Sequence, residues 1–209
     1  MKNDFLTPQE EFWSGEFGDE YITRNSSADL LAANLHFFSH ATSNMSTVNS
    51  VLEIGCNVGM NIRALNLLLP NTKVTGIEIN KKAADIARTI SSNNIIINDS
   101  VLSYNPSEKY DLVFTKGVLI HINPDQLNTL FLKIAKLSDK YVLIAEYFNP
   151  KPVSVNYRGH DDRLFKRDFA IDFIDKNTDF KLVDYRFHYK NVPNYSQDNI
   201  TWFLLERSK

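Results

Sequence analysis

The stretch that most constrains the fold of this chain is Val51–Asn61, VLEIGCNVGMN. A mostly apolar run leads into Gly55, three residues separate Gly55 from Gly59, and a polar stretch able to form a helix follows. This order predicts a buried strand, a tight turn and a helix N-terminus. Gly55 permits a backbone conformation that a Cβ would penalise, Gly59 lets the helix close on the strand, and exposed N–H groups of the turn can bind a carboxylate or phosphate. The stretch therefore predicts a site for a nucleotide-like ligand.

A second acidic residue follows at the spacing that a nucleoside site requires. Thr72–Asn80, TKVTGIEIN, is predicted to be the next strand and carries Glu78 at its end. At this distance after the turn, an acidic side chain accepts hydrogen bonds from ribose hydroxyls. The two signals together favour a nucleoside cofactor, either S-adenosylmethionine or a dinucleotide such as NAD.

The acidic residue of the first strand decides between these two cofactors. The motif Glu53-x-Gly55-x-Asn57-x-Gly59 resembles the acidic-x-Gly-x-Gly-x-Gly motif of class I S-adenosylmethionine methyltransferases, with asparagine, which tolerates left-handed φ, in place of one glycine. The resemblance implies S-adenosylmethionine as cofactor and S-adenosylhomocysteine as product. It also implies that Asp99 faces the adenine amino group and that Lys116 lies beside the methionine portion. The predicted cofactor-binding residues are Glu53, Gly55, Asn57, Gly59, Glu78, Ile79, Asp99, Ser100, Lys116, Tyr21 and Arg24.

Strands and amphipathic helices alternate through the middle of the chain. This alternation predicts right-handed crossovers and a mainly parallel sheet with helices on both faces. Two consecutive strands without a helix between them then predict an antiparallel β-hairpin that closes the sheet, as in class I methyltransferases. The predicted fold class is therefore α/β, a Rossmann-like methyltransferase fold with seven strands. After the first strand, the expected elements are Met60–Leu69, Thr72–Asn80, Lys82–Ser91, Asn94–Asn98, Tyr110–Thr115, a helix from Asn123-Pro124, Tyr141–Glu146, Phe180–Tyr189 and Ile200–Arg207.

Composition narrows the class of protein. A length of 209 residues predicts a single domain, 1–209, with an N-terminal lid and helix at 1–45 and a substrate-loop insertion at 150–170. The formal charge of −2 does not indicate the basic surface that binds nucleic acid. The one cysteine, Cys56, excludes an internal disulfide framework. The sequence has no run long enough to span a bilayer and no signal-peptide pattern. We expect a cytoplasmic monomer or homodimer that binds neither membrane nor nucleic acid.

An aromatic segment precedes the first helix of the fold. Phe12–Asn25, FWSGEFGDEYITRN, contains Gly15 and Gly18, which favour a loop that folds over a ligand. The alternative is a helical cap whose aromatic side chains cover an apolar face. Ser26 or Ser27 then caps the helix that follows.

Two histidines are candidate general bases, because imidazole exchanges a proton near neutral pH. His121 follows the fourth strand in GVLIHINP, where packing before the Asn123 cap is an equal alternative. His160 is slightly preferred as the base, because it lies among expected acceptor contacts. His36 and His40 have metal-ligand spacing, but no third ligand accompanies them, so we expect no metal.

The segment Glu146–Ala170, EYFNPKPVSVNYRGHDDRLFKRDFA, combines cations with aromatic residues. Such a charged run is usually a solvated face. Arginine, however, suits bidentate recognition of carboxylate or phosphate, and a helix would place Lys166 and Arg167 beside Arg163. We therefore expect this segment to bind the methyl acceptor. The predicted acceptor-binding residues are Tyr147, Tyr157, Arg158, Arg163, Lys166, Arg167 and Asn25.

Three segments together carry a more specific resemblance. FWSGEFGDEYITRN, LEIGCNVGMN and EYFNPKPVSVNYRGHDDRLFKRDF are similar to the bacterial family called pseudaminic acid biosynthesis-associated methylases. The resemblance implies a role beside genes for nonulosonic acids or related surface sugars. We expect methyl transfer to the O or N of a small polar anionic metabolite, such as a sugar acid or nucleotide-activated sugar. The alternatives are a non-catalytic S-adenosylmethionine-binding module and a nucleic-acid methyltransferase, which the charge balance disfavours.

Overall fold

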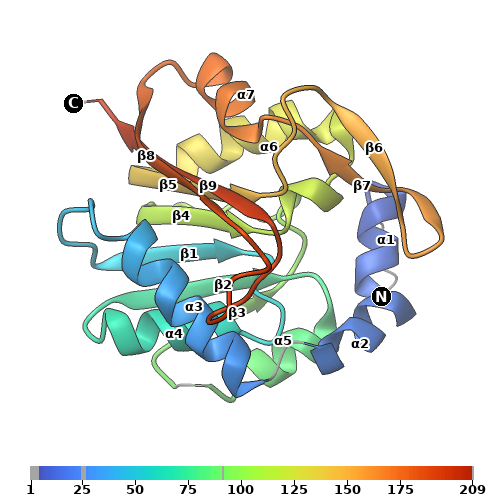
Figure 1. Ribbon diagram of the computed structural model, residues 1–209, viewed down its shortest axis with the longest axis horizontal. Helices are drawn as coiled ribbons and strands as arrows, with labels where there is room; N and C mark the ends of the chain where they lie inside the picture. Colours follow the sequence, from blue (N-terminus) through green and yellow to red (C-terminus); the bar gives the residue numbers. More distant parts are fainter. Residues whose placement is uncertain (1–4, 25–26, 91, 209) are drawn as a thin grey trace.

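A seven-stranded sheet forms the centre of the molecule (Figure 1). The structure is a computed structural model that describes residues 5–24, 27–90 and 92–208. Across the sheet the strands follow the order β3 (Ile95–Asn98), β2 (Lys73–Glu78), β1 (Ser50–Ile54), β4 (Tyr110–Lys116), β5 (Ser138–Glu146), β9 (Ile200–Arg207) and β8 (Phe180–His188).

One strand of this sheet opposes its neighbours. The pairs β1–β2, β1–β4, β2–β3 and β4–β5 are parallel, whereas β9 is antiparallel to both β5 and β8. The predicted mainly parallel sheet with a closing hairpin is confirmed. Because β9 lies between β5 and β8, the sheet is completed by a strand that comes late in the sequence.

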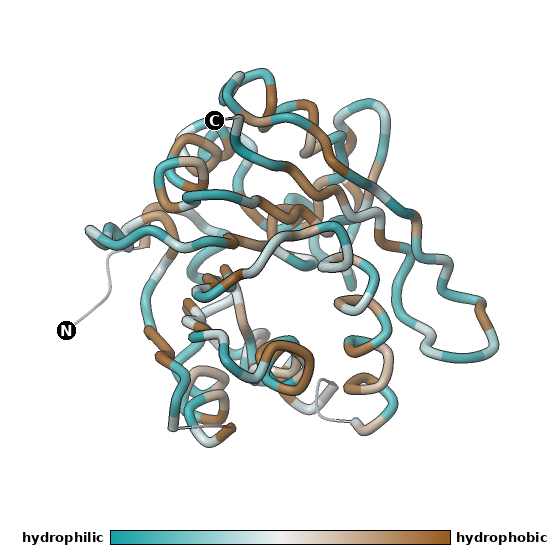
Figure 2. The backbone as a smooth tube through the Cα atoms, turned by 90° about the vertical axis from the view of Figure 1, so that its left-hand side faces the viewer, coloured by the Kyte–Doolittle hydropathy of each residue, from teal (hydrophilic) through white to brown (hydrophobic). Residues whose placement is uncertain are grey.

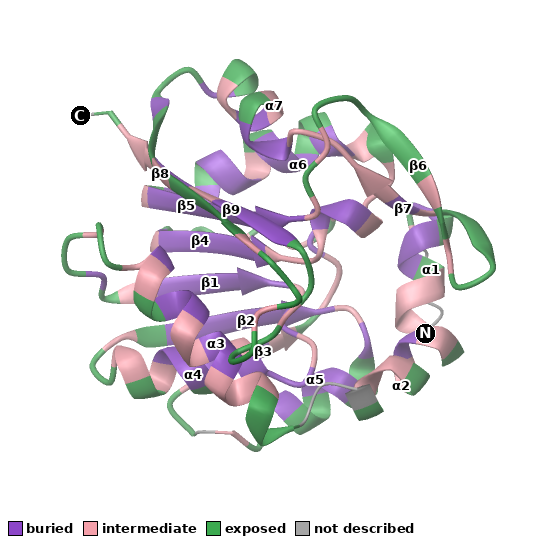
Figure 3. Cartoon of the chain, viewed as in Figure 1, coloured by how far each residue is buried: buried purple, intermediate pink, exposed green. Residues whose placement is uncertain are grey.

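Helices cover both faces of the sheet. The helices α3 (Ala28–Ala41), α4 (Met60–Leu68) and α5 (Lys81–Ala87) share one core with Val51, whereas α6 (Pro124–Leu137) and α7 (Phe169–Lys176) share another core with Leu52. Adjacent residues of β1 thus enter opposite cores, as the two-residue period of a strand requires. The central strands are buried and mostly hydrophobic, whereas the connecting segments are largely hydrophilic (Figures 2 and 3).

The N-terminal aromatic segment is helical. It forms α1 (Pro8–Ser14), α2 (Glu16–Tyr21) and the 3₁₀ helix η1 (Ile22–Arg24), so the prediction of a loop is wrong over residues 12–24 and the helical alternative is correct there. Thr7 and Glu10 form a capping box that starts α1. Gly15 joins the two helices, and Gly18 approaches the carbonyl of Trp13 so closely that a Cβ would lie 1.9 Å from that oxygen.

The insertion after β5 is a β-hairpin that projects beside α1 (Figure 1). It consists of β6 (Val153–Tyr157) and β7 (His160–Lys166), which pair antiparallel. Arg158 and Gly159 connect them with φ values of 52° and 85°, as a two-residue type I′ turn requires. The helical arrangement considered for this segment is therefore wrong, and alternation along β7 places Arg163 and Lys166 on opposite faces.

Among the residues that the structure describes, no helix is long and apolar enough to cross a bilayer.

Candidate functional site

A cleft of about 800 Å³ lies at the edge of the sheet where β1, β2 and β4 end. In sheets of this kind, ligands bind beyond the carboxyl ends of the parallel strands. Several parts of the chain line the cleft: the turn after β1, the residues that follow β2, β3, β4 and β5, the N-terminal helices and α3, the hairpin at Tyr157 and Arg158, and the loop between β8 and β9.

The turn after β1 forms the floor of the cleft. Gly55, Asn57 and Gly59 have φ values of 72°, 48° and 81°, so the unusual backbone conformation expected at Gly55 and Asn57 is confirmed and Gly59 shares it. A Cβ on Gly59 would lie 2.4 Å from the Cδ1 atom of Ile90, which follows α5. Gly59 thus allows close packing against the α5 segment, rather than against the strand as expected.

The N–H groups of this turn are occupied within the protein. Gly55 and Cys56 donate to the carbonyl of Ile77 at 2.8 and 3.0 Å, and Gly59 donates to the carbonyl of Cys56 at 2.8 Å. Asn57 N–H donates to Oε2 of Glu78 at 2.7 Å. The expectation that the turn offers exposed N–H groups to a ligand is therefore wrong for these positions.

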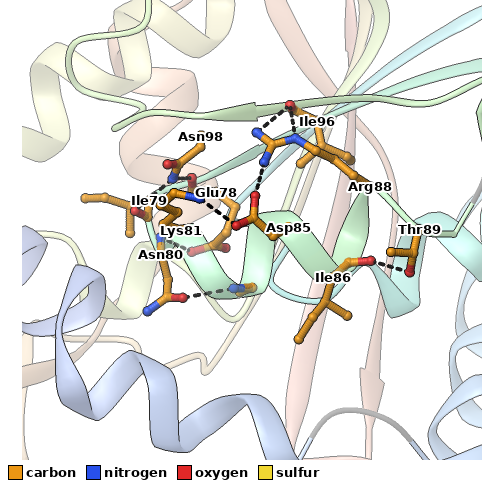
Figure 4. A network of polar contacts seen from close by, with 11 residues as sticks. Glu78, Ile79, Asn80, Lys81, Asp85, Ile86, Arg88, Thr89, Ile96 and Asn98 are labelled. Carbon is orange, nitrogen blue, oxygen red and sulfur yellow. Dashed lines mark hydrogen bonds and ion pairs between the residues drawn. The ribbon is translucent and has the colours of Figure 1, made fainter.

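Glu78 is held rigidly at the end of β2. Besides the bond from Asn57, its Oε1 accepts the N–H of Asn80 at 2.7 Å, and Asn98 donates to the backbone carbonyls of Glu78 and Ile79 at 2.9 and 3.1 Å (Figure 4). Burial raises the pKa of Glu78, although the N–H bonds act against this shift. Glu78 and Ile79 both line the cleft, so this carboxyl is a fixed acceptor at the predicted place.

A buried polar group lies on the α3 and α4 side of the floor. Glu53 is 1% exposed and accepts a hydrogen bond from Asn61 at 2.7 Å, and burial raises its pKa to about 8. Lys116 at the end of β4 donates to Oδ1 of Asn34 at 3.2 Å, and burial lowers its pKa to about 8, against the attraction of Glu53. Asn34, Asn61 and Lys116 line the cleft, whereas Glu53 lies behind them.

The residues after β3 line the opposite end of the cleft. Asp99 accepts hydrogen bonds from the N–H of Ser100 and the hydroxyl of Ser103, both at 2.7 Å. The hydroxyl of Ser100 donates to Glu10 of α1. Asp99 and Ser100 therefore lie where they were predicted, and Ser100 connects this end of the cleft to the N-terminal helices.

His121 lines the cleft at the end of the 3₁₀ helix η2 (Leu119–His121). Its Nδ1 lies 2.6 Å from the carbonyl of Arg163, and its ring packs against Trp13 and Tyr157 with centroids 4.5 and 5.1 Å apart. A carbonyl only accepts, so Nδ1 carries the proton and Nε2 keeps its lone pair. Burial lowers the pKa of His121 to about 4, which keeps the ring neutral at physiological pH.

His160 does not accompany His121 in the cleft. It is exposed on the hairpin, where it packs edge-on against Phe12 at 5.0 Å, and it does not line the cleft. The preference for His160 over His121 is therefore wrong. His160 begins β7 beside the hairpin turn, where its ring contacts Phe12 of α1 and Phe17 of α2.

The four predicted cations of the hairpin do not converge. Only Arg158 lines the cleft. The guanidinium of Arg163 lies over the Phe12 ring at 5.1 Å, Lys166 lies over the Tyr147 ring at 5.4 Å, and Arg167 forms an ion pair with Asp172 at 2.5 Å. The predicted cluster of three charges on one helical face is therefore wrong.

Aromatic residues form the wall of the cleft next to the hairpin. Tyr21, Tyr147 and Tyr157 line it as predicted, together with Trp13. Tyr147 donates to Asp198 at 2.6 Å, and burial is the main cause that raises its pKa. Asn25 lies outside the described residues, and Arg24 is described only as the end of η1.

Several lining residues were missed by sequence reasoning. Trp13, Asn34, Asn61 and Asp198 come from elements distant in the sequence, and Gln197 donates to the carbonyl of Ala33 at 2.6 Å. Asn61 is the one with a sequence signal, because it lies two residues after Gly59 in the first turn of a helix that starts at the cofactor turn. The others depend on tertiary packing.

Cys56 is buried, and burial raises its pKa. Its Sγ lies 2.7 Å from the position that a Cβ on Gly76 would take, so it fills the space beside β2. Across residues 5–24, 27–90 and 92–208, no group of three His, Cys, Asp or Glu side chains could hold a metal ion.

The strand order and the cleft define the class I methyltransferase fold. Residues 52–138 match the family model described as a methyltransferase domain. Malonyl-[acyl-carrier protein] O-methyltransferase 1 of Ilyobacter polytropus is 30% identical over 112 residues, which cover 52% of this chain and 40% of that protein. The chain thus spans less than half the length of that curated relative.

Solved structures are similar over nearly the whole chain. Magnesium protoporphyrin IX methyltransferase from Synechocystis PCC 6803, crystallised with S-adenosylhomocysteine, has a TM-score of 0.68 at 15% identity and covers 95% of this chain and 97% of its own. The 1,6-didemethyltoxoflavin-N1-methyltransferase of Burkholderia thailandensis, with its acceptor and S-adenosylhomocysteine bound, has a TM-score of 0.70 at 15% identity, and the alignment covers 100% of this chain and 94% of that one. These similarities confirm the predicted fold class.

Proposed function

We propose that the protein binds S-adenosylmethionine in the cleft and transfers its methyl group to a small molecule. The observation that carries this proposal is the fixed carboxyl of Glu78 at the end of β2, where a ribose is bound in sheets of this order. S-adenosylmethionine and S-adenosylhomocysteine accompany several of the similar structures, which supports the same cofactor here.

The polar residues of the cleft suit the two ends of this cofactor. Asp99 and Ser100 provide hydrogen-bonding groups for adenine, and the ammonium of Lys116 neutralises the methionine carboxylate at the other end. Glu53 acts from behind the floor, where it orients Asn61. Cofactor binding by Tyr21 would come from the α2 side, and a role for Arg24 remains a prediction.

Methyl transfer is an in-line displacement, so the protein contributes alignment and, for a hydroxyl or ammonium acceptor, removal of a proton. We propose that Nε2 of His121 accepts the proton that the methyl acceptor loses. This nitrogen carries a lone pair because Nδ1 donates to Arg163, and the ring is neutral and faces the cleft. His160 does not line the cleft, so we do not propose it as the base.

For the acceptor we propose a small polar anion, of which a sugar acid or nucleotide-activated sugar is the example that the resemblance implies. Support comes from Arg158 and Lys190, the two cations besides Lys116 that line the described part of the cleft. Tyr147, Tyr157 and Trp13 form an aromatic wall for a ring beside them. Arg163, Lys166 and Arg167 are engaged elsewhere and have no part in this proposal.

Calorimetry with S-adenosylhomocysteine and with NAD tests the cofactor. We expect S-adenosylhomocysteine alone to bind the wild-type protein, and its affinity to fall in Glu78→Ala because the ribose loses its acceptor. The exposed Glu108→Gln serves as a control that retains the affinity. Binding of NAD alone would refute the proposal.

Incubation with S-adenosylmethionine and bacterial metabolite extract tests the chemistry. Formation of S-adenosylhomocysteine that His121→Asn abolishes supports methyl transfer with His121 as base. Tight cofactor binding without product from any extract would instead favour a non-catalytic binding module.

A further inference from the structure

One buried carboxyl of the molecule has no role in cofactor or acceptor binding. Glu146, the last residue of β5, is 2% exposed and does not line the cleft. Its Oε1 accepts the N–H groups of Val118 and Leu119 at 3.1 and 3.0 Å, and its Oε2 accepts that of Ile120 at 3.4 Å. Three consecutive backbone donors thus converge on one side chain.

These donors are the ones that a helix leaves unpaired at its start. They begin η2, and its N-cap residue Val118 forms no side-chain hydrogen bond to them. Glu146 therefore provides, from the neighbouring strand, the cap that the local sequence lacks. A carboxylate suits this task because both oxygens accept, whereas a glutamine amide has one accepting oxygen and would direct its NH₂ group at an N–H.

The capped helix determines where His121 lies. The N–H of His121 donates to the carbonyl of Val118 at 2.9 Å, and Nδ1 is bound to the hairpin at Arg163. Gly117, with φ of 70°, directs the chain out of β4 while its N–H still pairs with Ala145 at 2.9 Å. The imidazole is thus held from β5 through the backbone and from β7 through the ring.

We propose that Glu146 is a positioning residue that holds η2, and through it His121, where the acceptor loses its proton. The catalytic consequence rests on the proposed function, whereas the structural link to His121 can be tested without it. Burial raises the pKa of Glu146 to about 7, and the N–H bonds of Leu119 and Val118 lower it.

Titration of His121 by NMR, in protein without added ligand, tests the link. The wild-type ring has a pKa of about 4 because it is buried. In Glu146→Ala we expect this pKa to rise by at least one unit toward the ordinary value of about 6.5, since a loosened η2 admits water to the ring. Glu146→Gln, which keeps one accepting oxygen, should give a smaller rise, and His121→Asn assigns the signal among the five histidines.

Asp111→Ala is a matched control. Asp111 also accepts two backbone N–H groups, from Asn49 and Ser50 at 2.7 and 3.3 Å, but at the opposite edge of the sheet. The variant loses the same kind of hydrogen bond. Because that bond lies at the opposite edge of the sheet, His121 should keep its wild-type pKa. An unchanged His121 pKa in folded Glu146→Ala overturns the proposal, and Glu146→Gln carries the test if the alanine variant does not fold.

Two further measurements separate this proposal from the proposed function. The dissociation constant of S-adenosylhomocysteine should stay within twofold in Glu146→Ala, and product formation from metabolite extract should fall by about 10–100-fold through misplacement of the base. Partial recovery in Glu146→Gln supports the positioning role. If the wild-type protein does not bind S-adenosylhomocysteine, the proposed function fails while the His121 titration still decides the link.

Discussion

Lys116 provides a positive charge at the end of the cleft that we assign to the methionine portion of the cofactor. Its ammonium is buried, and Asn34 is its hydrogen-bond partner. A carboxylate placed there would gain a charge-assisted hydrogen bond, which contributes about 1.5–3 kcal/mol.

The Lys116→Met variant should therefore lose about 10–100-fold in affinity for S-adenosylhomocysteine. Its affinity for 5′-methylthioadenosine, which lacks the amino-acid carboxylate, should not change. Calorimetry with both ligands checks this, and Lys140→Met, at an ion pair with Asp111 away from the cleft, is the control. Equal losses for both ligands would show that Lys116 supports the fold instead of binding the carboxylate.

For single residues, the sequence predicts which of them lie at the ends of strands but not which groups they contact. Glu78, Asp99 and Lys116 line the cleft as expected, because the ends of parallel strands meet at one edge. His121 and His160 could not be ranked correctly, since their positions depend on how the hairpin packs against α1. Glu53 has the expected position in the motif but lies behind the cleft.

At the scale of elements, the N-terminal helices and the hairpin form one wall of the cleft. Gln9 of α1 donates to the carbonyl of Asp162 at 3.0 Å and accepts from Asn123 at 3.2 Å. Asp19 of α2 forms an ion pair with Lys82 at 2.5 Å. The wall is thus attached to Asn123 before α6 and to Lys82 of α5 through exposed or half-buried polar contacts. Such contacts open more readily than a packed core.

This wall contains a natural reporter. Trp13 lines the cleft, whereas Trp202, the second of two tryptophans, is 2% exposed in the core. Addition of S-adenosylhomocysteine should change the intrinsic fluorescence, and Trp13→Phe should remove the change while Trp202→Phe retains it. A signal that persists in Trp13→Phe would place the ligand away from this wall.

The hairpin allows a comparison of cations within one element. Arg158→Ala should raise the apparent Michaelis constant for an anionic acceptor about tenfold or more, because it removes a charge from the cleft. Arg167→Ala, whose guanidinium is paired with Asp172, should leave that constant unchanged. Acceptors isolated from extract by mass spectrometry provide the substrate, and equal effects in both variants would argue against Arg158 as the contact.

Secondary-structure elements were predictable where one hydrophobic period, that of a helix or that of a strand, dominates the sequence. The strands and crossover helices of residues 51–146 follow the sequence within a few residues, because each has one continuous apolar stripe. The segments at 12–25 and 153–166 mix aromatic and charged residues, so neither period was decisive. Their structure depends on a capping box at Thr7 and on the Arg158-Gly159 turn.

The whole molecule should show a pH-dependent stability that its buried carboxyls determine. The folded pKa of Glu53, about 8, exceeds its ordinary value of 4.5. The folded state therefore retains a proton that the unfolded state releases, so this contribution to stability is complete below pH 4.5 and is lost as pH rises toward 8. The lowered pKa of Lys116 acts in the opposite direction, but only between about pH 8 and 10.5.

Thermal unfolding of Glu53→Gln at pH 5 and pH 8 checks this. Relative to wild type, the variant should gain on the order of 2 kcal/mol between the two pH values, or about 4–8 °C in Tm for a chain of this size, because glutamine does not titrate. The exposed Glu108→Gln should show no such gain. Parallel pH dependence in Glu53→Gln and wild type would assign the loss to other groups.

The position of β9 has a consequence for synthesis. This strand supplies Trp202, Leu204 and Leu205 to the two cores, and it separates β5 from β8. Until residues 200–207 have left the ribosome, β5 has an open edge, β8 has no strand to pair with, and both apolar layers are incomplete. Before residues 200–207 are made, the apolar surface that β9 covers is therefore exposed, and exposed apolar surface of this kind favours aggregation of incomplete chains.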